Sequence, residues 1–171
     1  MHRGWAISMV RATFAGPDGT TFTRDVVRHP GAVAVVAVTG GGGVVLVRQY
    51  RPAVDRWLLE IPAGTRDVAG EPPEQTARRE LAEEAGLAPG RLDLLTRCLN
   101  TPGFCDEETH VYLARDLHDV PHHRDGVEEE HLSVVEVGLD AFDGLVDDGT
   151  VVDAQTILGV ALARRRLTAG G

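Results

Sequence analysis

The segment from residue 74 to residue 85 constrains this chain more than any other, because its composition and its borders both favour a helix. It is rich in alanine, glutamate, arginine and leucine, which are good helix formers. Pro72 and Pro73 stand where a helix can begin, and Gly86 stands where one can end. The pattern therefore predicts a helix over residues 74–85.

Three glutamates of this predicted helix, Glu80, Glu83 and Glu84, are spaced so that they project from the same side. Like charges at this spacing destabilise an isolated helix by about 0.2–0.5 kcal/mol per pair. A divalent cation held among the carboxylates offsets this repulsion, and oxygen ligands suit Mg²⁺ or Mn²⁺. The alternative is a solvated acidic face, the commoner reason for such a cluster when it is taken alone. An apolar stripe runs beside the glutamates and adds a desolvation penalty: Ala77, Leu81 and Ala85.

The net charge of −9 is concentrated in the middle of the chain. Between Glu60 and Glu130 there are 17 carboxylates against 7 arginines, whereas the remainder holds 9 acids and 10 arginines. This excess has the same two interpretations, a solvated acidic surface or a site for cations. Because the one basic run is Arg164 to Arg166, a nucleic-acid-binding protein is disfavoured.

Length and composition place the chain among single-domain globular proteins. It has 171 residues, of which 43% are hydrophobic, and it contains no internal repeat. No apolar run approaches the ~18 residues that a membrane helix needs, and Met1 to Ser8 lacks the layout of a signal peptide. Cys98 and Cys105 are too few for a disulfide framework or a zinc site. We therefore expect no membrane partner, free thiols and a reducing, cytoplasmic location.

Strands and helices are mixed along the rest of the chain, which predicts an α/β or α+β sandwich. The turn residues 16–19 separate two strands of an N-terminal hairpin, and Gly40 to Gly43 join two valine-rich strands. Because a strand follows these glycines, we interpret them as a hairpin turn and not as a phosphate loop. Residues 116–129, rich in His, Pro and Asp, are expected to form a loop. The expected strands are 5–14, 20–28, 32–39, 44–49, 58–61, 92–99, 109–114 and 132–137, and two further helices are expected over 139–146 and 153–167.

The predicted helix belongs to a longer motif, which begins at Gly64 and continues through Glu71 to the run Arg79-Glu80-Leu81-Ala82-Glu83-Glu84-Ala85-Gly86-Leu87. This motif resembles the Nudix box, a loop–helix–loop signature of enzymes that hydrolyse a nucleoside diphosphate linked to another moiety. Every specified position matches from Glu71 onward; the departure is that six residues, not five, separate Gly64 from Glu71. The resemblance implies the Nudix fold, an α/β/α sandwich with a mixed sheet, and a requirement for Mg²⁺ or Mn²⁺.

By this resemblance, the helix and the strand before it supply the metal site. Glu80 and Glu84 are implied to be direct ligands, Glu83 to share or support a metal, and the Ala63 carbonyl to be a further ligand. Glu83 and Glu84 thus belong to the implied catalytic group. The structural members of the motif are implied to be Gly64, Gly86 and an ion pair between Glu71 and Arg79.

Two further segments resemble the ADP-ribose pyrophosphatase subfamily. Leu59-Glu60-Ile61-Pro62-Ala63-Gly64 is similar to the strand that enters the box in those enzymes. Pro102 lies fifteen residues after Leu87, in a loop similar to the one that borders the terminal ribose. Arg51 matches an arginine that contacts the substrate phosphates, and Arg28 is expected to assist it. The implied contacts from the loop are Gly103, Phe104 and Glu107.

The run Glu128-Glu129-Glu130-His131-Leu132 resembles the mobile acidic loop of this subfamily. Setting Leu132 against the family's aliphatic position makes Glu128 the base that activates water and Glu130 a metal ligand. The register of this assignment stays open by one residue, and a solvated acidic patch is the alternative. One aromatic ring is expected to stack on the adenine, and the candidates are Trp5, Tyr50 and Trp57.

The resemblance covers residues 24–160 and also implies an assembly. In the subfamily the N-terminal hairpin exchanges with a second subunit and completes the substrate pocket, so a domain-swapped homodimer is expected. The chain then divides into a dimer-exchange hairpin over residues 1–30 and a Nudix hydrolase domain over residues 31–171. The implied reaction is metal-dependent hydrolysis of ADP-ribose to AMP and ribose 5-phosphate. The alternatives are another nucleoside diphosphate sugar or a dinucleotide as substrate, and a catalytically silent domain that senses ADP-ribose.

Overall fold

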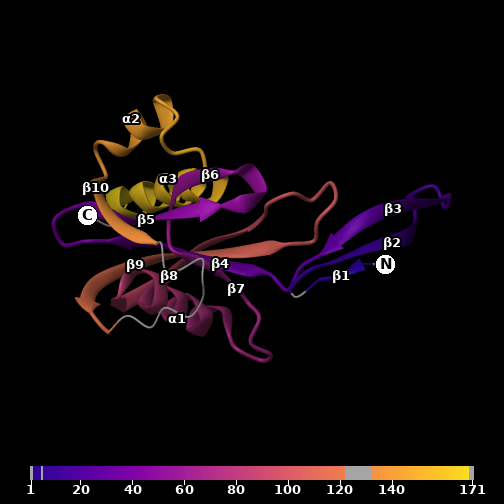
Figure 1. Ribbon diagram of the computed structural model, residues 1–171, viewed down its shortest axis with the longest axis horizontal. Helices are drawn as coiled ribbons and strands as arrows, with labels where there is room; N and C mark the ends of the chain where they lie inside the picture. Colours follow the sequence, from indigo (N-terminus) through magenta and orange to yellow (C-terminus); the bar gives the residue numbers. More distant parts are fainter. Residues whose placement is uncertain (1, 5, 122–131, 170–171) are drawn as a thin grey trace.

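In the computed structural model, which describes residues 2–4, 6–121 and 132–169, the chain forms two β-sheets and helices that cover the larger one (Figure 1). The smaller sheet is N-terminal and contains β1 (His2–Arg3), β2 (Ser8–Ala15) and β3 (Thr21–Arg28). The larger sheet contains β4 (Ala32–Val38), β5 (Gly43–Arg51), β6 (Arg56–Glu60), β7 (Ala63–Thr65), β8 (Leu87–Leu99), β9 (Glu108–Asp119) and β10 (Ser133–Gly138). The helices are α1 (Pro73–Ala85), α2 (Phe142–Asp147) and α3 (Ala154–Ala169), with a 3-10 turn at Pro52–Val54.

Strand β4 lies at the centre of the larger sheet, whose order is β10-β5-β4-β9-β8, with β6 paired to β5 and β7 paired to β4. It runs antiparallel to β5 and parallel to β9, so the sheet is mixed. All seven residues of β4 are buried, because α1 covers one face of the sheet and α3 covers the other (Figure 1). Burial on both faces explains why this strand is an unbroken apolar run without alternation.

The two faces of β4 contribute to two separate apolar cores. On one face Val33 and Val35 pack with Leu81 of α1. On the opposite face Val36 packs with Val160 of α3. The architecture is therefore the α/β/α sandwich with a mixed sheet that the resemblance implied.

Helix α1 begins and ends close to where the sequence predicted. Pro72 precedes its first residue, and Gly86 ends it with a φ of 67°, a conformation that glycine adopts without strain. The Gly86 N–H donates to the Ala82 carbonyl at 3.0 Å. Because the apolar stripe through Leu81 faces the sheet, the glutamates of the helix are directed along its flank. No helix of the described residues is long and apolar enough to cross a membrane.

Parts of the sequence interpretation are wrong where strands extend through polar residues. Residues 116–119, expected in a loop, continue β9, and β8 begins at Leu87 rather than at Leu92. The two extensions pair with each other, with Leu87 opposite Asp119. Leu117 packs against the core beneath α1. Pairing between distant segments, together with this apolar contact, forms a strand where the composition suggested a loop. The helix expected over 139–146 also begins later, because residues 139–141 form a turn before α2.

Both predicted hairpins are present. Strands β2 and β3 pair antiparallel along their full length. Between β4 and β5, the Thr39 N–H donates to the Gly43 carbonyl at 2.9 Å and closes the glycine turn. The four glycines therefore connect two strands, as the sequence indicated.

The N-terminal hairpin projects away from the sandwich and joins it at the loop between β8 and β9 (Figure 1). The Val27 N–H donates to the Phe104 carbonyl at 2.7 Å, and the Asp106 N–H donates to the Val27 carbonyl at 3.2 Å. Arg28 Nη1 donates to Asp106 Oδ2 at 2.8 Å. We call this contact region, formed by residues 27–29 and 101–107, the junction.

Candidate active site

Two glutamates of α1 face the short strand β7, where the backbone leaves room for them. Glu80 and Glu84 are only 8% and 5% exposed. Gly64 lies directly against the Glu80 carboxylate, and a Cβ atom at this position would overlap it. Glycine at position 64 is therefore a requirement for packing a carboxylate against β7.

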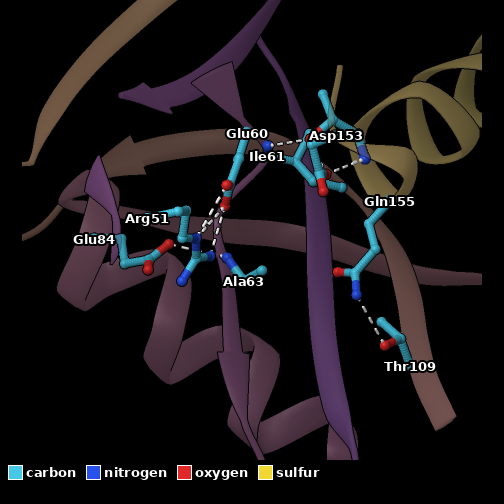
Figure 2. Close-up of polar contacts among 9 residues, drawn as sticks. Arg51, Glu60, Ile61, Ala63, Glu84, Thr109, Asp153 and Gln155 are labelled. Carbon is cyan, nitrogen blue, oxygen red and sulfur yellow. Dashed lines mark hydrogen bonds and ion pairs between the residues drawn. The ribbon is translucent and has the colours of Figure 1, made fainter. Parts of the chain in front are cut away.

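The backbone at the start of β7 is held by hydrogen bonds from two neighbouring elements. The Ala63 N–H donates to Glu84 Oε2 at 2.9 Å (Figure 2). The Val35 N–H of β4 donates to the Pro62 carbonyl at 2.8 Å. These bonds place the Ala63 N–H beside the Glu84 carboxylate, whereas the role of the Ala63 carbonyl as a metal ligand stays a prediction.

Arg79 is the centre of the charge network on α1. Its Nη1 lies 2.8 Å from carboxylate oxygens of both Glu80 and Glu83. Its Nη2 lies 3.4 Å from Glu71 Oε2 and 3.7 Å from Asp67 Oδ1. Arg79 thus joins the loop before the helix to the helix itself, and the expected contact between Glu71 and Arg79 is present.

Burial and charge shift the protonation of this network. Burial raises the pKa of Glu80 to about 7, although the Arg79 charge lowers it; the Glu83 charge adds to the rise. Burial alone would lower the pKa of Arg79, but Glu80, Glu71 and Glu83 outweigh it and the pKa lies above its ordinary value. A cation beside Glu80 favours its charged form and brings this pKa down.

The donor atoms at this place fit a hard divalent cation. Two buried carboxylates, those of Glu80 and Glu84, lie against β7 and supply oxygen, and the Ala63 N–H donates to one of them. Within residues 2–4, 6–121 and 132–169, no three His, Cys, Asp or Glu side chains converge on a common point. Glu80 and Glu83 are instead both paired with the Arg79 guanidinium.

Arg51 of β5 reaches the same backbone. Figure 2 shows its guanidinium beside Ala63, between the carboxylates of Glu60 and Glu84. Arg51 Nε donates to Glu60 Oε1 at 3.0 Å, and Nη2 donates to Glu60 Oε2 at 2.6 Å. A cavity of about 260 Å³ lies beside this pair, and its lining includes Leu58 and Gln155. Arg51, the predicted phosphate-binding arginine, therefore lines a cavity that Ala63 also lines.

The predicted contacts from the loop after β8 lie together at the junction. Phe104 is 57% exposed, and its carbonyl is bonded to β3. Glu107 lies 3.8 Å from His29 Nδ1, and Arg28 is paired with Asp106. The structure thus separates the predicted residues into two groups, one along α1 and β7 and the other at the junction, which also contains Gly103.

The remaining predictions fall partly outside the described residues. Glu128 and Glu130 lie there, and so does Trp5. Of the other aromatic candidates, Tyr50 and Trp57 lie with ring centroids 5.7 Å apart and are 38% and 42% exposed. The Arg48 guanidinium lies 4.4 Å from the Trp57 ring centroid. An exposed aromatic pair of this kind is available for stacking.

Sequence reasoning missed the contacts that fix the corner between β6 and β7. The fully buried Thr156 accepts a hydrogen bond from the Ile61 N–H at 2.9 Å, and it donates to Asp153 Oδ2 at 2.7 Å. The Thr156 N–H also donates to Asp153 at 2.8 Å (Figure 2 labels Ile61 and Asp153). An aspartate three residues before a threonine at a helix start is a capping signal, but it does not indicate contact with a strand 95 positions away. The sequence indicated Glu60 only as a member of the strand motif before Gly64, and it did not predict the hydrogen bonds between Glu60 and Arg51.

Comparisons with known proteins point to one family. Residues 28–157 match the model of the NUDIX domain. The chain is 42% identical to an ADP-ribose pyrophosphatase of Bacillus subtilis over 144 residues, which are 84% of this chain and 77% of that protein. It is 39% identical to an ADP-ribose pyrophosphatase of Mycobacterium tuberculosis over 170 residues, which are 99% of this chain and 82% of that protein. A crystal structure described as an ADP compounds hydrolase matches with a TM-score of 0.83 and 24% identity, covering 100% of this chain and 91% of the other, and supports the fold.

Proposed function

This chain belongs to the Nudix family, and we propose that it hydrolyses the pyrophosphate of ADP-ribose to AMP and ribose 5-phosphate. The observation that carries the proposal is the 39% identity to an ADP-ribose pyrophosphatase across 99% of the chain. The site agrees with this substrate, because buried carboxylates for a cation and an arginine for phosphate oxygens lie beside one backbone segment. The reaction adds water to one phosphorus, breaks one phosphorus–oxygen bond of the bridge, and divides the two phosphates between the products.

The residues along α1 and β7 bind and orient the pyrophosphate. Glu80, Glu84 and the Ala63 carbonyl would hold Mg²⁺ or Mn²⁺, and Glu83 would support them. A bound divalent ion supplies positive charge to the phosphate oxygens and makes water easier to deprotonate. Arg51 contacts the phosphate oxygens that the metal ions do not reach, because its planar guanidinium can donate hydrogen bonds to two oxygens at once.

The run of glutamates before Leu132 supplies the proton acceptor in this proposal. We assign Glu128 as the base that takes a proton from the attacking water, and Glu130 as a further metal ligand. Both lie outside the described residues, so the assignment depends on the motif.

The N-terminal hairpin supports a proposal about assembly. Residues 1–30 are assigned to dimer exchange and residues 31–171 to the hydrolase domain. Met9 is 54% exposed and Phe22 is 40% exposed, so the hairpin offers apolar surface to a second copy of the chain. At the junction, Arg28, Gly103, Phe104 and Glu107 would then border the substrate. Cys98 and Cys105 are free thiols, which agrees with the cytoplasm as the proposed location.

A panel of substrates tests the proposed reaction. Purified protein with Mg²⁺ or Mn²⁺ is given ADP-ribose, GDP-mannose, NADH and 8-oxo-dGTP, and the products are separated by chromatography. We expect AMP and ribose 5-phosphate, with the highest kcat/KM for ADP-ribose. Preference for another nucleotide sugar or a dinucleotide would reassign the substrate within the family. Activity on a triphosphate alone would refute the proposal, and lack of all turnover with intact ADP-ribose binding would favour a sensor.

The first prediction concerns Glu84 of α1. Glu84→Gln removes a charge from the proposed metal site, and we expect kcat to fall on the order of 100-fold or more while the fold survives. Circular dichroism and thermal unfolding check the fold, and steady-state kinetics check the loss. The matched control is Glu74→Gln on the same helix, where the exposed carboxylate pairs with Arg78. A Glu84→Gln variant with near-wild-type turnover would show that the ligand assignment is wrong.

A further inference from the structure

Arg51 and Glu60 form an ion pair although they are not opposite each other in the pairing of β5 with β6. In the ladder between β5 and β6, Arg51 is opposite Arg56, whereas Glu60 is opposite Val47. Val47 and Arg51 are four positions apart on β5, so Arg51 and Glu60 project from the same face of the sheet. Both side chains extend along the strands to meet, and they do so with three hydrogen bonds between 2.6 and 3.1 Å.

The two partners differ in exposure: Glu60 is buried, whereas Arg51 reaches the cavity. Glu60 is 5% exposed, and within the described residues its carboxylate is paired with Arg51, which compensates the buried charge. The Arg51 side chain is 38% exposed and lines the cavity beside Ala63. The bonds to Glu60 use Nε and Nη2, so the planar fork presents Nη1 on the side away from Glu60. Glu60 therefore sets which edge of the guanidinium faces the cavity.

Other carboxylates also attract Arg51. Glu84 and Asp153 are both close enough to act on its charge, and Figure 2 shows Glu84 on the far side of the guanidinium from Glu60. If the Glu60 charge were removed, the guanidinium would turn toward these carboxylates, and it would compete with a cation at Glu84. The choice between these partners decides both where Arg51 points and how strongly it opposes cation binding.

We propose that Glu60 is a positioning residue: its hydrogen bonds keep Arg51 available to the phosphates of the substrate and restrain the guanidinium, which lies between Glu60 and Glu84, from moving onto the cation site at Glu84. The claim about substrate phosphates rests on the proposed function, whereas the claim about cation binding does not. Glu60 touches neither substrate nor cation in this scheme and acts through Arg51. The pair therefore links phosphate binding to cation binding within one site.

A double-mutant cycle tests the proposal. Glu60→Gln, Arg51→Gln and the double variant are compared with the wild type by direct titration with Mn²⁺, without substrate. With Arg51 present, we expect Glu60→Gln to weaken Mn²⁺ binding about tenfold. In the Arg51→Gln background we expect the same change at Glu60 to have little effect, because the competing cation is gone. Equal weakening in both backgrounds, or none in either, would overturn the proposal.

Kinetics give the second readout and separate positioning from a structural role. We expect Glu60→Gln to raise KM for ADP-ribose about tenfold, with a smaller effect on kcat, because Arg51 no longer meets the phosphates. A lower kcat with unchanged KM and unchanged Mn²⁺ affinity would mean only partial unfolding, and it would overturn the proposal. The control is Asp93→Asn, which breaks a 2.6 Å pair with Arg115 on β8 and β9 and should change neither quantity.

The two proposals can fail separately. If the wild type does not hydrolyse ADP-ribose, the proposed function falls, and the Mn²⁺ cycle still decides the role of Glu60. If the wild type hydrolyses ADP-ribose and the cycle shows no coupling, the role of Glu60 falls alone. Should Glu60→Gln unfold, the double variant is compared with Arg51→Gln, and a difference in Mn²⁺ affinity between these two would overturn the proposal, because Glu60 should act only through Arg51.

Discussion

Strand β4 of the sandwich and the two strands of the β2–β3 hairpin are similar in length, with seven and eight residues, but have opposite environments. All seven residues of β4 are buried, and Val33, Val35 and Val36 are completely inaccessible. No residue of β2 or β3 is buried, and even the stacked pair Phe14 and Phe22 is more than a third exposed. The first segment is held by apolar packing on two faces, whereas the second is held by its own backbone ladder and by pairs between its strands.

This difference shows what each region contributes by itself. The sandwich buries its own apolar surface and positions Glu80 and Glu84 against β7 without help from the hairpin. A two-stranded hairpin with no core is marginal in water, so its order depends on the junction and, in the proposed dimer, on a second copy. The hairpin is therefore the region where assembly should change stability, and the sandwich is the region where it should not.

Truncation of one large side chain in each region should give the largest contrast in stability. Leu46→Ala in the completely buried centre of β5 is expected to lower the free energy of unfolding by about 2–5 kcal/mol. Phe22→Ala in the hairpin loses mainly its stacking on Phe14, and we expect less than about 1.5 kcal/mol. Urea unfolding followed by circular dichroism measures both. Equal losses at all protein concentrations would contradict the contrast, whereas a Phe22 loss that grows with concentration would indicate that a second copy covers it.

A smaller contrast tests how tightly the sandwich is packed. Gly159 of α3 lies so close to the sheet that a Cβ atom would be 2.9 Å from Val36 Cγ2 and 3.0 Å from Ile61 Cδ1. Overpacking of about 1–3 kcal/mol exceeds the helix propensity that alanine gains, so Gly159→Ala should destabilise the fold by about 1–2 kcal/mol. Gly144 of α2 has open space around it, and Gly144→Ala should be neutral or stabilising. Thermal unfolding of the two variants compares them, and a stabilised Gly159→Ala would show that α3 can move away from β4.

Local signals in the sequence predicted much of the fold because they belong to single segments. The prolines before α1 and Gly86 after it mark the ends of that helix, and the apolar run of β4 indicates burial on both faces. The extension of β9 was missed because it depends on pairing with residue 87 and its neighbours, more than 25 positions earlier in the chain. Strand pairing of this kind leaves no mark in either segment alone.

The candidate site divides in the same way. The glutamates of α1 follow from a contiguous motif, since the helical repeat alone places them on one side. The pair between Arg51 and Glu60 depends on strand register, and the bond between Ile61 and Thr156 joins residues 95 positions apart. These contacts arise from tertiary packing, so composition and spacing could not reveal them.

Acidification should weaken the junction, and this is the smallest of the expected effects. The hydrogen bond from Arg28, together with the His29 N–H, holds the pKa of Asp106 below its ordinary value of 3.8. Because the folded form has the lower pKa, this stabilisation is complete above about pH 4 and is lost as the pH falls through the folded value. The partners are 46% and 41% exposed, so screening limits the contribution to less than about 1 kcal/mol.

Asp106→Asn should reproduce this loss at neutral pH, because the amide keeps the shape and removes the charge that Arg28 meets. Hydrogen exchange of the β2–β3 amides measures it, and we expect faster exchange there with unchanged protection in β4. The matched control is Asp143→Asn, which breaks an exposed pair with Arg164 between α2 and α3. If that variant loosened the hairpin equally, the effect would come from net charge and not from the junction. If Asp106→Asn changed neither region, the backbone bonds of Val27 would be sufficient to hold the hairpin to the sandwich.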